Sequence, residues 1–181
     1  DVTALGRRLG ATLKRMMPNS RLRLIQEPGR FIAADAGILV TRVTSVKRSE
    51  ETFIGVDAGM NTLVRPAMYN AYHHILYPAD LSLAHDTPAH VVGQICENRD
   101  FIARQRLLPR GVNVGDVLTL LDAGAYGFAM SSRFHAKPFA AEVMVRNGEA
   151  EIIRPRLNIE EMLLGTRRPS WMHFEKARQA G

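Results

Sequence analysis

The stretch GILVTRVTSV, residues 37–46, decides the fold, because aliphatic and β-branched side chains take over here from a segment with helical spacing. Similar runs rich in Val, Ile, Leu and Thr return along the chain, and each is bounded by Gly, Pro, Asn or Asp. The further runs are residues 52–56, 91–96, 117–121 and 141–145. The pattern predicts a mainly β domain of barrel or sandwich type.

The pair Asn147-Gly148 is the clearest turn signal in the chain. It separates residues 141–145 from residues 150–154 and is typical of a two-residue β-hairpin. Beyond the hairpin, Asn158 followed by Glu161 has the spacing of a helix start, and Gly165 predicts the end of that helix.

The first 36 residues follow a different pattern. Leu5, Leu9 and Leu13 have nearly helical spacing and predict an amphipathic helix over residues 3–17. Alternating side chains at residues 22–26 then predict a short strand that runs into a Pro-Gly turn. We therefore expect the end of a larger α/β domain at residues 1–36, a β domain at 37–165 and a basic tail at 166–181.

The composition argues against several classes of partner. The formal charge of +6 comes from 24 basic and 18 acidic residues, but the basic residues are dispersed and no aromatic side chains interleave with them, so we expect no nucleic-acid binding. No apolar stretch approaches the roughly 18 residues of a membrane-spanning helix, and the chain does not start with a signal-peptide pattern. We therefore expect no membrane contact and a cytoplasmic location.

Four polar clusters lie at turns or strand ends, where side chains are positioned rather than packed. They are Glu27–Arg30, Arg65–Tyr69, Cys96–Asp100 and Asp122–Gly127. The adjacent His73 and His74 follow the second cluster, but neighbouring side chains in a strand point to opposite faces, and no further ligands lie at metal-binding spacing. We expect no metal site.

Each cluster has a plain structural interpretation beside the functional one. Glu27 and Arg30 flank a turn, and the plain interpretation is a surface turn with a local ion pair between them. Cys96 is either a proton donor beside a substrate-binding carboxylate or a buried thiol next to a surface loop. The small residues around Tyr126 either let a ligand approach the backbone closely or form an ordinary Gly-rich turn.

Taken together, the order and spacing of these motifs point to one family. The matching text is EPGR at 27–30, DAGM at 57–60, RPAMY at 65–69, CE at 96–97, LLP at 107–109, DAGAYG at 122–127 and AAEV at 140–143. With these motifs, residues 1–165 of the sequence resemble the fold-type III pyridoxal-phosphate-dependent decarboxylases, and among them the diaminopimelate decarboxylases most closely.

The resemblance implies a cofactor, pyridoxal 5'-phosphate, and a turn at residues 27–30 that ends the last helix-strand unit of a TIM (β/α)8 barrel. Glu27 would face the pyridine nitrogen, and Gly29 and Arg30 would lie by the phosphate and the substrate. Tyr126 would contact both. Decarboxylation leaves an electron pair that the ring absorbs, and a carboxylate that keeps the ring nitrogen protonated favours this step.

The resemblance also implies the reaction, decarboxylation of meso-2,6-diaminopimelate to L-lysine. Arg65 and Tyr69 would hold the distal carboxylate of the substrate, and Glu97 its distal ammonium. Cys96 would protonate the carbon that has lost carbon dioxide. In this family Cys96 and Glu97 would reach into the partner subunit's site, which implies a homodimer with shared active sites.

Two departures from the family pattern leave the substrate open. Asn98-Arg99 stands where a small residue and glycine are usual, and Phe134-His135 where a Tyr-Asn pair is more usual. Decarboxylation of D-ornithine, D-lysine or a specialised-metabolite amino acid is therefore an alternative, as is a non-catalytic β domain that dimerises. The retained Arg65 argues for a substrate with a distal carboxylate.

The resemblance assigns the cofactor-binding lysine, a stacking histidine and a Gly-rich phosphate loop to earlier barrel strands that this sequence does not include. The four lysines that the sequence does contain stand in no matching context: Lys14, Lys47, Lys137 and Lys176. We therefore expect that this polypeptide alone neither binds the cofactor covalently nor decarboxylates a substrate.

Overall fold

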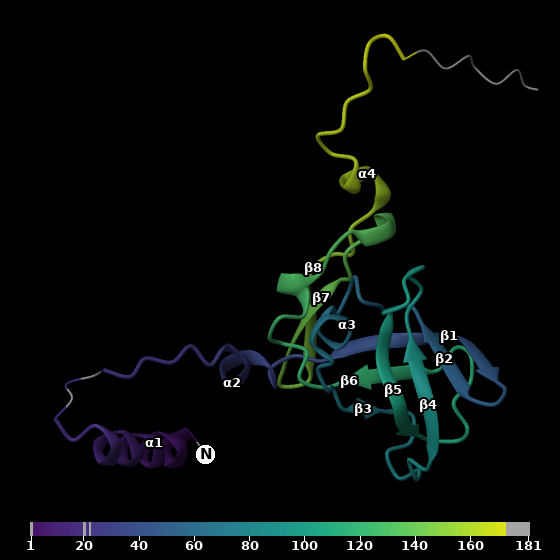
Figure 1. Cartoon of the computed structure of the whole chain (residues 1–181). Helices are drawn as coiled ribbons and strands as arrows, with labels where there is room; N and C mark the ends of the chain where they lie inside the picture. The colour runs from purple at the N-terminus through teal and green to yellow at the C-terminus, as the bar shows by residue number, and fades with distance from the viewer. Residues whose placement is uncertain (1, 20, 22, 173–181) are drawn as a thin grey trace, which may run out of the picture.

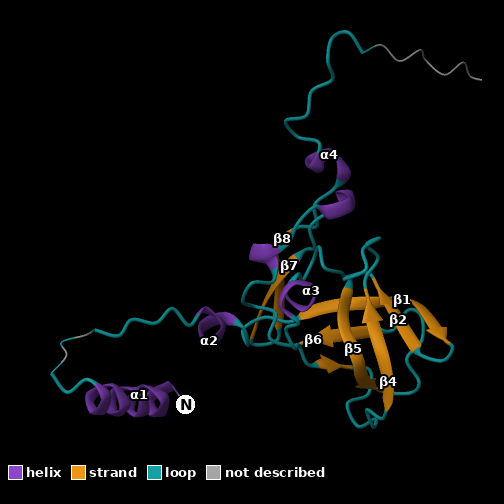
Figure 2. Cartoon of the chain, viewed as in Figure 1, coloured by secondary structure: helices purple, strands orange, loops and turns teal. Residues whose placement is uncertain are grey.

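The computed structural model describes residues 2–19, 21 and 23–172 (Figure 1). Strands make up most of the regular structure, and the helices after the first are short (Figure 2). The helices are α1 (Val2–Met16), α2 (Gly29–Ala33), α3 (Arg65–Tyr69) and α4 (Ile159–Met162). Two 3-10 turns cover Phe128–Met130 and Phe134–Ala136.

The main sheet has six strands in the order β3-β6-β1-β2-β4-β5. They are β1 (Leu39–Arg48), β2 (Thr52–Val56), β3 (Ile75–Leu76), β4 (Thr87–Val92), β5 (Phe101–Leu108) and β6 (Val117–Leu120). Neighbouring strands are antiparallel, except that β2 and β4 are parallel. The edge strands β3 and β5 are not paired with each other, so the barrel-like sheet stays open between them. A separate hairpin consists of β7 (Glu142–Arg146) and β8 (Glu149–Arg154).

The hydrophobic core lies inside the curve of the main sheet. Alternation along β1 decides its two faces, since Thr41 and Val43 are buried while Val40 and Arg42 are exposed. The side chains at the centre of the core have no exposed surface: Val56, Val91, Leu118 and Leu120. Because each such side chain contributes about 1.5–3 kcal/mol when buried, this core is the main source of stability.

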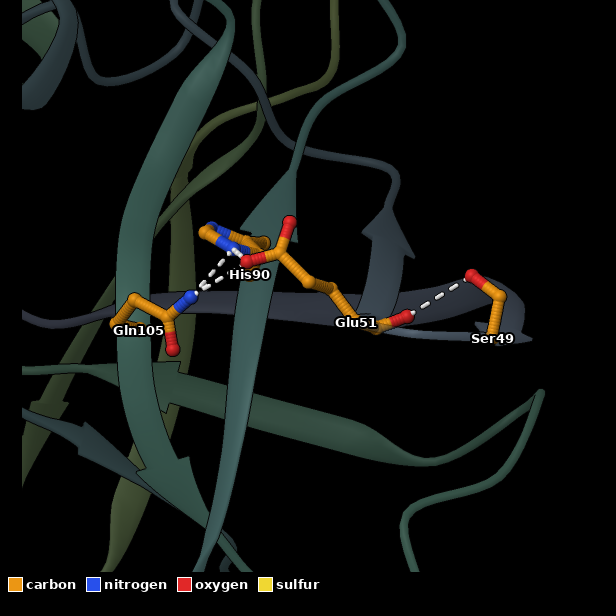
Figure 3. Close-up of polar contacts among 4 residues, drawn as sticks. All are labelled: Ser49, Glu51, His90 and Gln105. Carbon is orange, nitrogen blue, oxygen red and sulfur yellow. Dashed lines mark hydrogen bonds and ion pairs between the residues drawn. The ribbon is translucent and has the colours of Figure 1, made fainter.

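His90 on β4 is a polar residue within the core. Its ring stacks on Phe53 with the centroids 5.0 Å apart and meets the edge of Phe101 at 5.6 Å. Its Nε2 atom lies 3.3 Å from the Glu51 carboxylate and 3.1 Å from the Gln105 amide (Figure 3). These contacts join the β1–β2 turn to β4 and β5, so the role of His90 is structural.

The structure confirms the β domain that the sequence predicted. The run at 37–46 forms β1, and the hairpin turns at Asn147 and Gly148, whose φ angles of 51° and 83° suit a type I' turn. The predicted capping box also forms, because Asn158 accepts from the Glu161 amide while the Glu161 carboxylate accepts from the Asn158 amide.

The strand predicted at residues 22–26 is wrong for the part that the structure describes. Residues 23–28 have no regular secondary structure, and Leu22 lies outside the described residues. A strand needs a hydrogen-bonded neighbour, and none of the described residues pairs with this segment. The predicted helix before it does form, as α1, although none of its described residues is buried. Figure 1 shows α1 at the end of this extended segment, away from the sheet.

The prediction for residues 91–96 is also partly wrong, because β4 ends at Val92. Residues 93–100 form a loop, so Cys96 lies within this loop and not at a strand end. The loop leads into β5, a long strand that the sequence did not predict. Its charged residues obscure the alternation, and the positive φ of 48° at Gln105 interrupts it.

Candidate functional site

The loop at residues 122–127, which follows β6, is tied to the segment that follows α2. The Ala123 amide donates to the Gly37 carbonyl (2.8 Å), and the Gly124 amide donates to the Ala34 carbonyl (3.0 Å). A Cβ atom at Gly124 would overlap the Ala33 carbonyl oxygen. Glycine at this position therefore allows the two backbones to meet.

His73 holds the same loop from the other side. It is 3% exposed, and its Nδ1 atom lies 2.9 Å from the Leu121 carbonyl, so the ring donates this hydrogen bond. The Leu121 amide in turn donates to the His74 carbonyl (2.8 Å). Two adjacent histidines suggest only metal binding, which their spacing argues against. The sequence therefore gives no signal of this anchoring role.

Tyr126 projects from this loop towards the turn at residues 27–30. Its backbone has a φ of 58°, a left-handed conformation that is uncommon for a tyrosine and that directs the side chain. A Cβ atom at Gly29 would overlap the Tyr126 hydroxyl, so glycine at position 29 leaves the space that the hydroxyl takes. The motifs at 27–30 and 122–127 thus meet at these two residues.

Arg65 joins the third motif to this cluster. Its guanidinium carbon lies 5.3 Å from the centre of the Tyr126 ring and 5.8 Å from that of Tyr69, within the range of cation–π interactions. Pro66 lies in the first turn of α3 and the left-handed Asn70 caps its end, so that Arg65 and Tyr69 lie one helical turn apart on the same face. The guanidinium is therefore held between two phenol rings.

Glu27 and Arg30 are exposed beside this cluster. The Gly29 amide donates to the Glu27 carbonyl (2.8 Å), which forms the tight turn that the Pro-Gly pair predicted. Within the described residues no ion pair joins Glu27 to Arg30, so the simple surface ion pair is not what the turn forms.

Cys96 and Glu97 lie on a different loop. Both are exposed, and among the described residues no hydrogen bond, ion pair or ring contact joins either of them to Arg65 or Tyr126. The structure therefore brings together the motifs at 27–30, 65–69 and 122–127, while Cys96 and Glu97 of the remaining motif make none of these contacts. Exposure also removes the interpretation of Cys96 as a buried thiol.

A cavity of about 670 Å³ lies between α3 and the start of β5. Tyr69 and Arg99 both line it, together with Tyr72, Arg104 and Arg106. Arg106 lies over the Tyr72 ring at 3.9 Å. Arg99, one of the two departures from the family pattern, is thus adjacent to a predicted substrate-binding residue.

No group of three or more His, Cys, Asp or Glu side chains in residues 2–19, 21 and 23–172 lies close enough to hold a metal ion. No helix in the same part of the chain is long and apolar enough to cross a membrane.

Gly124→Ala should lower the free energy of unfolding by about 1–3 kcal/mol, because the added methyl group overlaps the Ala33 carbonyl and the backbones must separate. Urea denaturation of a full-length protein that contains these residues measures the effect. Gly111→Ala is the matched control, since a Cβ atom there meets nothing within 4 Å. Equal stability of the two variants would contradict the close packing of the loop.

Most of the chain is similar to known proteins. Residues 30–124 match the family model described as pyridoxal-dependent decarboxylase, C-terminal sheet domain. Diaminopimelate decarboxylase of Methanothermobacter thermautotrophicus is 48% identical over 147 residues, which cover 80% of this chain and 33% of that protein. The enzyme of the same name from Aquifex aeolicus is 47% identical over 153 residues, covering 84% of this chain and 36% of that protein.

A solved structure shows the same likeness. Diaminopimelate decarboxylase from Helicobacter pylori, complexed with L-lysine, superimposes with a TM-score of 0.70 at 33% identity, covering 82% of this chain and 36% of that one. The chain spans about a third of the length of the curated relatives that it matches. Because the family model matches more than half of its residues, the chain belongs to the pyridoxal-dependent decarboxylase family, of which it carries the C-terminal sheet domain.

Proposed function

We propose that this chain supplies part of the active site of a pyridoxal-phosphate-dependent decarboxylase that converts meso-2,6-diaminopimelate to L-lysine. The observation that carries the proposal is the meeting of Gly29, Arg65 and Tyr126, three residues from separate motifs. The relatives named above support the same reaction. In this proposal residues 1–36 belong to a barrel domain, residues 37–165 form the β domain and residues 166–181 are a basic tail, of which 173–181 lie outside the described residues.

The residues around Tyr126 fit pyridoxal 5'-phosphate. When bound, this cofactor supplies a ring that takes up the electron pair left by decarboxylation. Glu27 offers a carboxylate for the ring nitrogen, and Arg30 and the Tyr126 hydroxyl offer donors for the phosphate. Glycine at position 29 leaves room for the Tyr126 hydroxyl, which places this donor beside the turn at residues 27–30. Neither Lys14 nor Lys47 belongs to this cluster, and Lys137 donates to Gln94, while Lys176 lies outside the described residues.

Arg65 and Tyr69 would bind the distal carboxylate of the substrate. The Arg65 guanidinium is held by two aromatic rings, so its planar donors are oriented before the substrate arrives. Arg30 and Tyr126 would contact the reacting end. A substrate held at both ends presents one of its two α-carbons to the cofactor, which accounts for the choice of centre.

Glu97 would bind the distal ammonium, and Cys96 would give a proton to the carbon that loses carbon dioxide. Both side chains are exposed, and among the described residues no contact joins them to Arg65 or Tyr126. In a homodimer each subunit would place its Cys96–Glu97 loop in the partner subunit's site. An exposed position is what such an exchange requires.

No observation separately favours another substrate or a non-catalytic role. D-ornithine and D-lysine lack a second carboxylate, which would leave Arg65 without the partner that its oriented guanidinium suits. A non-catalytic β domain has no physical need for an exposed thiol beside a carboxylate. The cytoplasmic location stays a prediction.

The test is a substrate panel. A full-length protein that contains this chain, with pyridoxal 5'-phosphate, is incubated separately with meso-diaminopimelate, D-lysine and D-ornithine, and the products are identified by chromatography. We expect L-lysine from the first and little cadaverine or putrescine from the others. The isolated chain should show no turnover and no borohydride-fixed cofactor. Preferential release of cadaverine or putrescine, or turnover by the isolated chain, would contradict the proposal.

A further inference from the structure

Asp100 lies at the base of the loop that carries Cys96 and Glu97. The loop connects β4 to β5, and the Gly93 amide donates to the Asp100 carbonyl (3.0 Å) at its base. The Asp100 amide donates to the Glu97 carbonyl at 3.0 Å. While Cys96 and Glu97 are exposed at the tip, Asp100 is only 4% exposed.

The two carboxylate oxygens of Asp100 bind two different segments. Oδ2 accepts the amide of Ile95, which precedes Cys96, at 2.7 Å. Oδ1 accepts the amide of Met60 at 2.6 Å. Met60 belongs to the turn that leads into α3, the helix of Arg65. One buried carboxylate thus connects the loop of the proposed proton donor to the helix of the proposed substrate-binding residues.

The surroundings of Asp100 are shaped to the carboxylate. A Cβ atom at Gly59 would lie 3.0 Å from both carboxylate oxygens, and one at Gly93 would overlap them. No ion pair in the described part of the chain includes Asp100, so backbone amides are what the carboxylate binds here. A buried carboxylate is costly unless its hydrogen bonds are made, so these two bonds hold their segments firmly.

A second link joins the same two segments. The side-chain amide nitrogen of Gln94 donates to the Asp57 carbonyl at 2.6 Å, and Lys137 donates to the oxygen of the same side-chain amide at 2.6 Å. The base of the loop is therefore attached to the turn at residues 57–60 on both sides. The tip of the loop, residues 96–99, is exposed.

We infer that Asp100 is a positioning residue, whose carboxylate holds the Cys96–Glu97 loop in register with α3. This inference rests on the proposed function for the roles of Cys96 and Glu97. In Asp100→Asn one oxygen becomes an amide group, which donates and so cannot accept from a backbone amide. The loop then loses one of its two attachments while the cofactor-binding residues keep their contacts.

The test uses a full-length protein that contains this chain. Asp100→Asn should lower kcat by about 10²-fold, the effect expected of a displacement of about 1 Å at a reacting group, at unchanged cofactor content. Amide hydrogen exchange at Met60 or Ile95 should accelerate in the same variant. Asn98→Ala, a change in the exposed part of the loop, should leave kcat and exchange unchanged.

Two outcomes would overturn the inference: kcat within twofold of the parent in a folded Asp100→Asn, or unchanged exchange at both amides. If Asp100→Asn does not fold, Gly59→Ala takes its place, because its methyl group presses on both carboxylate oxygens without removing them. We then expect faster exchange at Met60 and a lower kcat, and parent values would overturn the inference. The exchange measurement does not depend on activity, so failure of the proposed reaction is distinguishable from failure of this role.

Discussion

Cys96→Ala should lower kcat for meso-diaminopimelate by roughly 10²–10⁴-fold in a full-length protein that contains this chain, the range expected for loss of a general acid. The thiol is exposed on its loop and is the only thiol in the chain, so no neighbouring cysteine of the chain replaces it. Cofactor binding should be unchanged, because the proposed cofactor residues Glu27, Gly29 and Tyr126 lie on other segments.

The measurement is steady-state kinetics together with cofactor absorbance. Cys96→Ser tests the same position with a weaker acid and should fall between the parent and Cys96→Ala. Asn98→Ala controls for disturbance of the loop. Turnover of Cys96→Ala at the parent rate would remove Cys96 from the proposed mechanism.

Arg65→Lys should raise the KM for meso-diaminopimelate by about 10- to 100-fold. Lysine keeps the charge but loses the planar pair of donors and the contact with the Tyr69 and Tyr126 rings. A hydrogen bond between charged groups contributes about 1.5–3 kcal/mol, which corresponds to this range of affinity. The slow reaction with D-lysine should change little, because that substrate has no distal carboxylate.

The ratio of kcat/KM for the two substrates checks this prediction. Arg110→Lys is the matched control, because Arg110 is exposed between β5 and β6 and lines none of the cavities described above. A parallel loss with both substrates would show that Arg65 supports the fold or the cofactor and does not recognise the distal carboxylate.

Much of the β domain was predictable because its signals are local. The alternation in residues 37–46 and the Asn-Gly turn each determine their own structure, and the Asn158–Glu161 box needs only its own helix. The strand expected at 22–26 did not form in the described residues 23–26, because a strand needs a partner and no described residue pairs with them. β5 was missed because Arg104, Gln105 and Arg106 interrupt its apolar residues.

The candidate site, too, was predictable only in part. The sequence indicated Glu27, Arg65, Cys96 and Tyr126 as chemically suitable residues, but their spacing says nothing of which side chains meet. Arg99 was noted only as a departure, and its place beside Tyr69 appears only when α3 packs near β5. The anchoring role of His73 likewise depends on a carbonyl 48 residues away.

By itself, the sequence determined the residue types available for catalysis and the local strands, turns and caps, since these depend on neighbouring side chains. The tertiary structure alone decided that Gly29, Arg65 and Tyr126 converge while Cys96 lies apart. It also decided that the Asp100 carboxylate is buried between two glycines that are distant in the sequence. The physical reason is that these arrangements come from strand pairing and close backbone contact between distant segments, which no local pattern encodes.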